Sequence, residues 1–160
     1  FPYTTLFRSG LRPAVIVGLS VSRVGGAAQT KAMKKASGSI RIDLAQYREM
    51  EVFTQFSSDL DASTKEQLQY GKSLMELLKQ PLGSPLSLHE QVITLCAARH
   101  KIFMDLDVKR VKPFQTELLR YFDSSYPEIG EEIENTGVLS DELEERIVSA
   151  AKQYAETQIR

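Results

Sequence analysis

The sequence has a single cysteine, no tryptophan and no long hydrophobic run. Because Cys96 is alone, no disulfide can form within the chain, and we expect a reducing compartment. The longest apolar stretch, around residues 14–19, is far too short to cross a bilayer as a helix. A chain of 160 residues can still bury roughly 70% of its unfolded surface, so a stable core needs neither disulfide nor metal.

A strong excess of charge of either sign is also missing. The net charge is −1 and the isoelectric point is about 6.2, which argues against bulk attraction to nucleic acid or to an anionic membrane. The charge is nevertheless uneven: residues 10–50 hold seven Lys/Arg against two Asp/Glu, and residues 123–160 hold three against ten. Either an interface in a larger assembly or a solvated surface explains this polarity.

Several kinds of functional site lack their usual residues. His89 and His100 lie eleven positions apart, and Cys96 shares a helix face only with His100, a pair more typical of core filling than of catalysis. No clustered ligand spacing indicates a metal, so we expect none. The basic run Lys31–Lys35 has no interleaved aromatics and indicates a solvated helix face, not a nucleic-acid site. No glycine-rich loop followed by Lys and Ser/Thr is present to hold a triphosphate.

The beginning of the chain reads as two unlike pieces. Residues 1–9, FPYTTLFRS, resemble one reading frame of a sequencing adapter, and we leave them out of fold reasoning, although an irregular native N-terminus is the alternative. The apolar run at residues 13–22 is bounded by Pro13 and Gly25-Gly26 and predicts one buried strand. Because a lone strand is unstable, we interpret the chain as a fragment of a longer protein.

The remainder is predicted to be helical. Residues 27–56 carry apolar side chains at three- and four-residue spacing, with a kink or break expected at Gly38. Capping boxes at Ser63 and Ser87, with Glu66 and Glu90, are expected to begin the next two helices. The following helix is expected to begin at Asp107, with Pro113 either inside it as a kink or in its first turn. A short acidic turn of helix is expected from Pro127 to Glu134, and a last helix is expected to begin at Ser140. The predicted fold is mainly α: a bundle of five to six helices, preceded by a short orphan strand from a truncated α/β domain.

Arg23 stands out because it lies between the predicted strand and the Gly25-Gly26 break. A planar guanidinium can contact two phosphoryl oxygens at once, and it stabilises charge in a transition state only if it is held in place beforehand. Such an arginine finger contributes roughly 10³–10⁵ in rate. Spacing alone leaves two readings open, an arginine finger or an arginine in a surface turn.

Long segments of the sequence resemble one family. They are GLRPAVIVGLSVSRVGGAAQTKAMKK at residues 10–35, LAQYREME at 44–51, FSSDLD at 56–61, LLKQPLGSPLSLHEQV at 77–92 and LSDELEERI at 139–147. Together they resemble the alpha subunit of F-type ATP synthase, from the end of its nucleotide-binding domain through its C-terminal helical domain. The catalytic beta subunit has a different pattern at the SVSR position.

The resemblance implies a role in a rotary motor. Alpha and beta subunits alternate in a hexameric ring around a central gamma subunit, and ion flow across the membrane, of protons or sodium, is coupled to ATP synthesis. Arg23 is then the arginine finger that alpha supplies in trans to the phosphates at the beta catalytic site. Ser20 and Ser22 of the same SVSR motif would position that end of the strand.

The resemblance also implies part of a second nucleotide site, at which ATP is bound and not turned over. Arg12 and Pro13 match residues beside its adenine, and Gln80 matches a glutamine that contacts the base. Two departures bear on this site. Leu82 stands where the family often has a second glutamine, and Ile16 replaces a common asparagine.

Residues 10–28 are thus expected to end the nucleotide-binding domain, and residues 29–160 to form the helical domain. ATP or ADP with magnesium would be the cofactor of the full subunit, and this fragment alone should neither hold nucleotide firmly nor hydrolyse it. The complex would lie on the cytoplasmic face of a bacterial plasma membrane. The alternatives are a free-standing helical interaction module, which should have no orphan strand, and a related vacuolar or flagellar ring ATPase.

Overall fold

The computed structural model describes residues 22–54 and 61–158, and in these ranges the regular structure is entirely helical. The predicted orphan strand at residues 13–22 lies outside the described residues, apart from Ser22. The helices are α2 (Arg23–Ala28), α3 (Lys31–Ser37), α4 (Ile40–Thr54), α5 (Ala62–Leu77), α6 (Leu88–Arg99), α7 (Val108–Ser125), α8 (Pro127–Thr136) and α9 (Asp141–Gln158). The mainly α fold is confirmed, with more helices than the five or six expected.

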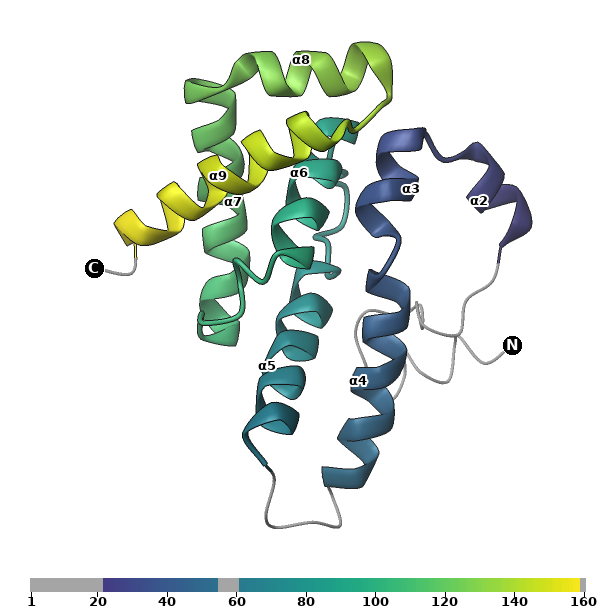
Figure 1. Cartoon of the computed structure of the whole chain (residues 1–160), viewed down its shortest axis with the longest axis vertical. Coiled ribbons are helices and arrows are strands. Elements are labelled where there is room, and N and C mark those ends of the chain that lie inside the picture. The colour runs from purple at the N-terminus through teal and green to yellow at the C-terminus, as the bar shows by residue number, and fades with distance from the viewer. Residues whose placement is uncertain (1–21, 55–60, 159–160) are drawn as a thin grey trace.

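Helix α6 is the centre of the molecule. It packs against α3, α7, α8 and α9, and Figure 1 shows these helices arranged around it. Its residues Val92, Ile93, Cys96 and Ala97 are all buried. The segment LHEQVITLCAAR has no charged residue between Glu90 and Arg99, so it lacks the polar face of a surface helix and is buried on several sides.

Helices α4 and α5 form an antiparallel pair that extends away from this centre (Figure 1). Ile40, Leu44 and Tyr47 face the interior from α4, as their three- and four-residue spacing predicts. Gly71 of α5 permits the two helices to approach closely, because a Cβ atom there would lie 2.2 Å from ring atoms of Tyr47. Helix α5 also packs on α7, and this contact joins the α4–α5 pair to the rest of the fold.

The predicted helix boundaries are confirmed at several points. Gly38 caps the end of α3, and α4 begins at Ile40. Ser87 forms the expected capping box: its Oγ accepts from the Glu90 amide at 3.3 Å, and its own amide donates to the Glu90 carboxylate at 2.6 Å. Ser140 caps α9 by accepting from the Leu143 amide at 3.0 Å.

Two helix boundaries differ from the prediction, at the start of α5 and at the end of α8, and the start of α7 decides between the two alternatives left open. Helix α5 begins two residues earlier than a Ser63 cap would place it, because Asp61 and not Ser63 is the capping residue and accepts from the Thr64 amide at 2.8 Å. Asp107 caps α7, which places Pro113 inside that helix and not in its first turn. The short acidic helical segment expected from Pro127 to Glu134 is the helix α8, which ends two residues later, at Thr136.

No helix in the described parts of the chain is both long and apolar enough to span a membrane.

Candidate functional site

Arg23 is the first residue of α2, and its side chain is exposed. The preceding residue, Ser22, has extended backbone angles and caps the helix: its Oγ accepts from the Gly25 amide at 2.9 Å, and its carbonyl accepts from the Gly26 amide at 3.0 Å. The expectation that Gly25-Gly26 interrupts the regular secondary structure is therefore wrong. Both glycines lie within the short helix, because the Ser22 cap satisfies its first amides.

The guanidinium of Arg23 makes no hydrogen bond or ion pair with the described part of the chain. All five of its N–H donors are therefore free for a group that is not part of this structure. Ser22 is the residue that fixes the start of the helix. Ser20, the other serine of the motif, lies outside the described residues, as do Arg12, Pro13 and Ile16.

Helix α3 connects α2 to the body of the fold. Thr30 caps α3 by accepting from the Met33 amide at 3.2 Å. The Ala32 amide donates to the carbonyl of Gly137 at 2.8 Å, at the turn between α8 and α9. Gly137 has a positive φ of 61°, and a Cβ there would lie 3.5 Å from the Thr30 side chain. The start of α3 is therefore fixed to a turn more than 100 positions later in the sequence.

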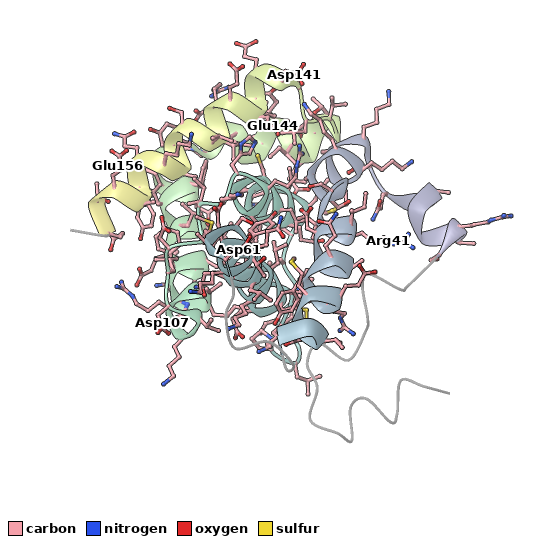
Figure 2. All side chains as sticks on the ribbon, turned by 60° about the horizontal axis from the view of Figure 1, so that its bottom comes forward. Arg41, Asp61, Asp107, Asp141, Glu144 and Glu156 are labelled. Atoms are coloured by element: carbon pink, nitrogen blue, oxygen red, sulfur yellow. The ribbon has the colours of Figure 1, made fainter. Side chains whose placement is uncertain are left out.

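Five ionisable side chains from α3, α9 and the end of α6 meet beside this turn, and we call them the Glu144 cluster: Lys35, Arg99, His100, Asp141 and Glu144. Lys35 Nζ lies 2.6 Å from Asp141 Oδ1 and 2.9 Å from Glu144 Oε2. Glu144 Oε1 lies 3.1 Å from His100 Nε2 and 3.5 Å from Arg99 Nη1. Figure 2 shows Asp141 and Glu144 at the start of α9, on the side that faces α3.

These contacts shift the acid–base properties of the cluster. Hydrogen bonds to Asp141 and Glu144 raise the pKa of Lys35, and the bond from Lys35 lowers the pKa of Asp141. Burial opposes the charge on Glu144, but hydrogen bonds from Lys35 and His100 and the nearby charge of Arg99 outweigh it and lower its pKa. All of these shifts favour the charged forms. The sequence-based reading of Lys31–Lys35 as a solvated face is thus wrong for Lys35.

Two members of the cluster, His100 and Glu144, also lie close to Cys96 and form with it a set of possible metal-ligand atoms. One donor atom each from Cys96, His100 and Glu144 lie within 4.8 Å of one another, a donor set that suits zinc. However, Lys35 and Arg99 already neutralise Glu144 and would repel a divalent ion. Burial, followed by the nearby Glu144 charge, raises the pKa of the Cys96 thiol to about 12, which opposes the thiolate that a metal or a nucleophilic reaction requires. The arrangement is that of an ion-pair network.

Gln80 follows the C-terminal end of α5, and its side chain is exposed. It borders a cavity of about 720 Å³ between the loop at residues 79–86 and α7. Apolar side chains and charged side chains of both signs line this cavity together, among them Pro81, Leu86, Lys112, Arg120, Glu90 and Asp123. Leu82 does not line it and is fully exposed to solvent.

Lys112 is the half-buried cation of that cavity. Its Nζ donates to the Leu77 carbonyl at 2.7 Å and to Gln115 Oε1 at 2.9 Å, and within the described ranges it forms no salt bridge. Burial lowers its pKa. The cavity therefore combines an apolar wall with a cation whose charge is not neutralised by direct contact with a carboxylate.

His89 of α6 contacts side chains of two other helices. Its backbone amide and its Nδ1 approach Glu134 Oε1 at 2.9 and 2.8 Å, and its Nε2 lies 3.6 Å from Asp123. The hydrogen bonds from His89 lower the pKa of Glu134. His89 therefore connects α6 to α7 and α8 and has a structural role. Glu134 belongs to the acidic segment at residues 128–135, of which Glu128 and Glu132 are also paired, both with Arg146.

Comparisons with known proteins agree with the fold. Residues 29–154 match the family model described as the ATP synthase alpha/beta chain, C terminal domain. The protein named ATP synthase subunit alpha from Acetivibrio thermocellus is 53% identical over 157 residues, which is 98% of this chain and 31% of that protein. The proteins of the same name from Clostridium kluyveri and Caldanaerobacter subterraneus are 49% and 47% identical over 96% and 94% of this chain. The chain thus spans about a third of the length of these curated relatives. It belongs to the ATP synthase alpha/beta chain family and groups with the alpha subunits.

Proposed function

We propose that this chain is the C-terminal part of an alpha subunit in a rotary F-type ATP synthase, and that Arg23 acts as an arginine finger in trans. The catalytic site that it serves would be held by a neighbouring beta subunit. The observation that carries this proposal is the state of Arg23: it is exposed, it begins a capped helix, and its guanidinium has no partner among the described residues.

The chemistry of the guanidinium fits this role. In phosphoryl transfer, charge accumulates on the phosphoryl oxygens, and catalysis depends largely on donors that are already in position when it does. The Ser22 cap fixes the backbone on which Arg23 is carried. An arginine already paired with a carboxylate of its own chain would first have to break that pair. Ser22 is therefore proposed as a positioning residue, and Ser20 as a second one.

Gln80, Arg12 and Pro13 are proposed to contribute to a second site, where nucleotide is bound and not turned over. Support comes from Gln80, whose carboxamide offers both a donor and an acceptor at the edge of the 720 Å³ cavity, a volume in the usual range for small-molecule sites. Magnesium and most phosphate contacts would come from parts of the longer subunit. Leu82 has no polar group with which to contact the base, so Gln80 would act there without a second glutamine.

The proposed partners are beta subunits in an alternating ring and a central gamma subunit. The complex would couple proton or sodium flow to ATP synthesis at the cytoplasmic face of a bacterial plasma membrane. Residues 10–28 would complete the nucleotide-binding domain and residues 29–160 would form the helical domain. The chain alone is expected to be inactive, because it contains no phosphate-binding loop.

The test is Arg23→Ala in the full-length subunit, assembled into its complex. We expect multisite ATP turnover to fall by roughly 10³–10⁵, the range measured for arginine fingers, while assembly by gel filtration is unchanged. Arg41→Ala is the matched control, because Arg41 is also an exposed arginine without an ion pair in the described structure. Turnover of Arg23→Ala within threefold of the unmodified complex would remove Arg23 from the mechanism.

A further inference from the structure

Lys35 is the residue of α3 with the most contacts to distant parts of the chain. Its ammonium group donates to the Leu139 carbonyl at 3.1 Å and pairs with Asp141 and Glu144 at 2.6 and 2.9 Å. Its own carbonyl accepts from Arg99 Nη1 at 2.7 Å. A single residue therefore connects α3 to α6, to the α8–α9 turn and to the first turn of α9.

The neighbouring lysines of the same helix behave differently. Lys31 and Lys34 are exposed, and neither forms an ion pair with the described residues. The Lys35 side chain is 33% exposed and Glu144 only 13%. The contrast shows that the basic run does not act as a uniform charged surface, and that one of its members has a specific set of partners.

The position of α3 determines where α2 lies. None of the residues of α2 is buried, so packing of its own side chains into the core does not hold it. Only Gln29 and Thr30 separate it from α3. Figure 1 shows α2 at the edge of the molecule beyond α3. Among the described residues α2 is thus joined to the body of the fold through α3, so a shift of α3 against the α8–α9 turn would carry α2 and Arg23 with it.

We propose that Lys35 is a positioning residue for Arg23, which it keeps in place by fixing α3 to the start of α9. This inference rests on the proposed arginine-finger function. Lys35 itself touches no reacting group. Its contribution is geometric: a misplacement of about 1 Å caused by a distant substitution can lower a rate by as much as about 100-fold, because the donors no longer meet the developing charge.

A merely structural role for Lys35 makes a different prediction. If Lys35 only stabilised the helical domain, its loss would lower the amount of assembled complex, and any effect on turnover would be the same whether or not Arg23 is present. If it acts through Arg23, its effect on turnover must disappear once the Arg23 guanidinium is gone. A double-mutant cycle separates the two cases.

The experiment compares Lys35→Met, Arg23→Ala and the double variant in the full-length subunit, assembled with its partners. We expect Lys35→Met to lower kcat by about tenfold with KM for ATP changed less than twofold. In the Arg23→Ala background the same substitution should change the residual kcat by less than twofold. Lys35→Arg, which can keep the ion pairs, should recover at least half of the lost activity. Lys34→Met is the matched control and should behave as the unmodified complex.

The outcomes distinguish this inference from the function on which it rests. Near-normal turnover of Arg23→Ala overturns both. A large loss for Arg23→Ala with normal kcat for Lys35→Met overturns only the role of Lys35. An equal fold-loss from Lys35→Met in both backgrounds shows that Lys35 acts independently of Arg23, and overturns it as well. If Lys35→Met does not assemble, Lys35→Gln and the Asp141→Asn variant test the same contact, with the same cycle and the same criteria.

Discussion

Substituting Gly71 by alanine tests the packing of the α4–α5 pair. The added Cβ would lie 2.2 Å from Cγ and Cδ2 of Tyr47 and 2.5 Å from its Cβ. Carbon atoms in favourable contact are about 3.5–4.0 Å apart, so the shortfall is more than about 1 Å. The atoms in conflict belong to the root of the tyrosine side chain, which cannot rotate away. The two helices would have to separate, and Tyr47, now 5% exposed, would lose part of its packing.

The expected magnitude follows from two opposing terms. Replacing glycine by alanine inside a helix favours folding by about 1 kcal/mol, because alanine has the better helix propensity. Overpacking of a tight contact costs about 1–3 kcal/mol, and a clash with backbone-proximal atoms belongs at the upper end. We therefore expect a net loss of about 2 kcal/mol in the free energy of unfolding, or roughly 6 °C in Tm for a chain of this size.

The assay is thermal and urea unfolding of the chain followed by circular dichroism. Gly26→Ala is the control, because a Cβ at that exposed helical position meets nothing within 4 Å. It should leave Tm unchanged or raise it slightly. If Gly71→Ala also proved neutral or stabilising, the helices could not be as close as the structure places them, and the account of the α4–α5 contact would be wrong.

Two further predictions concern the helix ends and the Glu144 cluster. Ser87→Ala should lower the free energy of unfolding by about 1 kcal/mol, because it removes the acceptor of the Glu90 amide; Ser124→Ala, on an exposed residue of α7, should change it by less than half as much. The Glu144 cluster predicts a loss of stability in acid, because the pKa values of Glu144 and Asp141 are lowered in the folded state. Their contribution to the free energy of unfolding is complete above the ordinary carboxyl pKa, about 4–4.5. It is lost as the pH falls through the lower pKa values of the folded state. In urea titrations between pH 7 and pH 3, Glu144→Gln should reduce this pH dependence, and an unchanged slope would show that the cluster does not contribute.

Local signals in the sequence predicted much of the helical architecture. Ser87, Asp107 and Ser140 start helices because a capping side chain acts over three residues, and such a pattern is visible without knowledge of the fold. Where two candidate capping residues lie close together, sequence rules do not show which of them begins the helix. Asp61 rather than Ser63 begins α5, since an aspartate can satisfy the same amides, and Ser63 instead donates to it.

The long-range contacts could not be predicted in the same way. Lys35 and Asp141 are 106 positions apart, and the sequence around Lys35 is typical of a solvated basic helix. Tyr47 and Gly71 give no local sign that they touch. For the candidate site, the importance of Arg23 was inferred mainly from family resemblance. The Ser22 cap and the free guanidinium are what the structure adds to that inference, and the break expected at Gly25-Gly26 is replaced by the helix α2, while the predicted strand before Arg23 stays a prediction.

The most direct test of the central claim is to measure binding of a transition-state analogue, ADP with aluminium fluoride, to the assembled complex with and without the Arg23 guanidinium. An arginine finger contacts the charge that develops during phosphoryl transfer, so its removal should weaken the analogue far more than the ground-state ligand. We expect Arg23→Ala to lower the affinity for the analogue by about 10³ and the affinity for ADP by less than threefold. Equal losses for the two ligands, or no loss for the analogue, would contradict the assignment of Arg23 to the catalytic site of a neighbouring subunit.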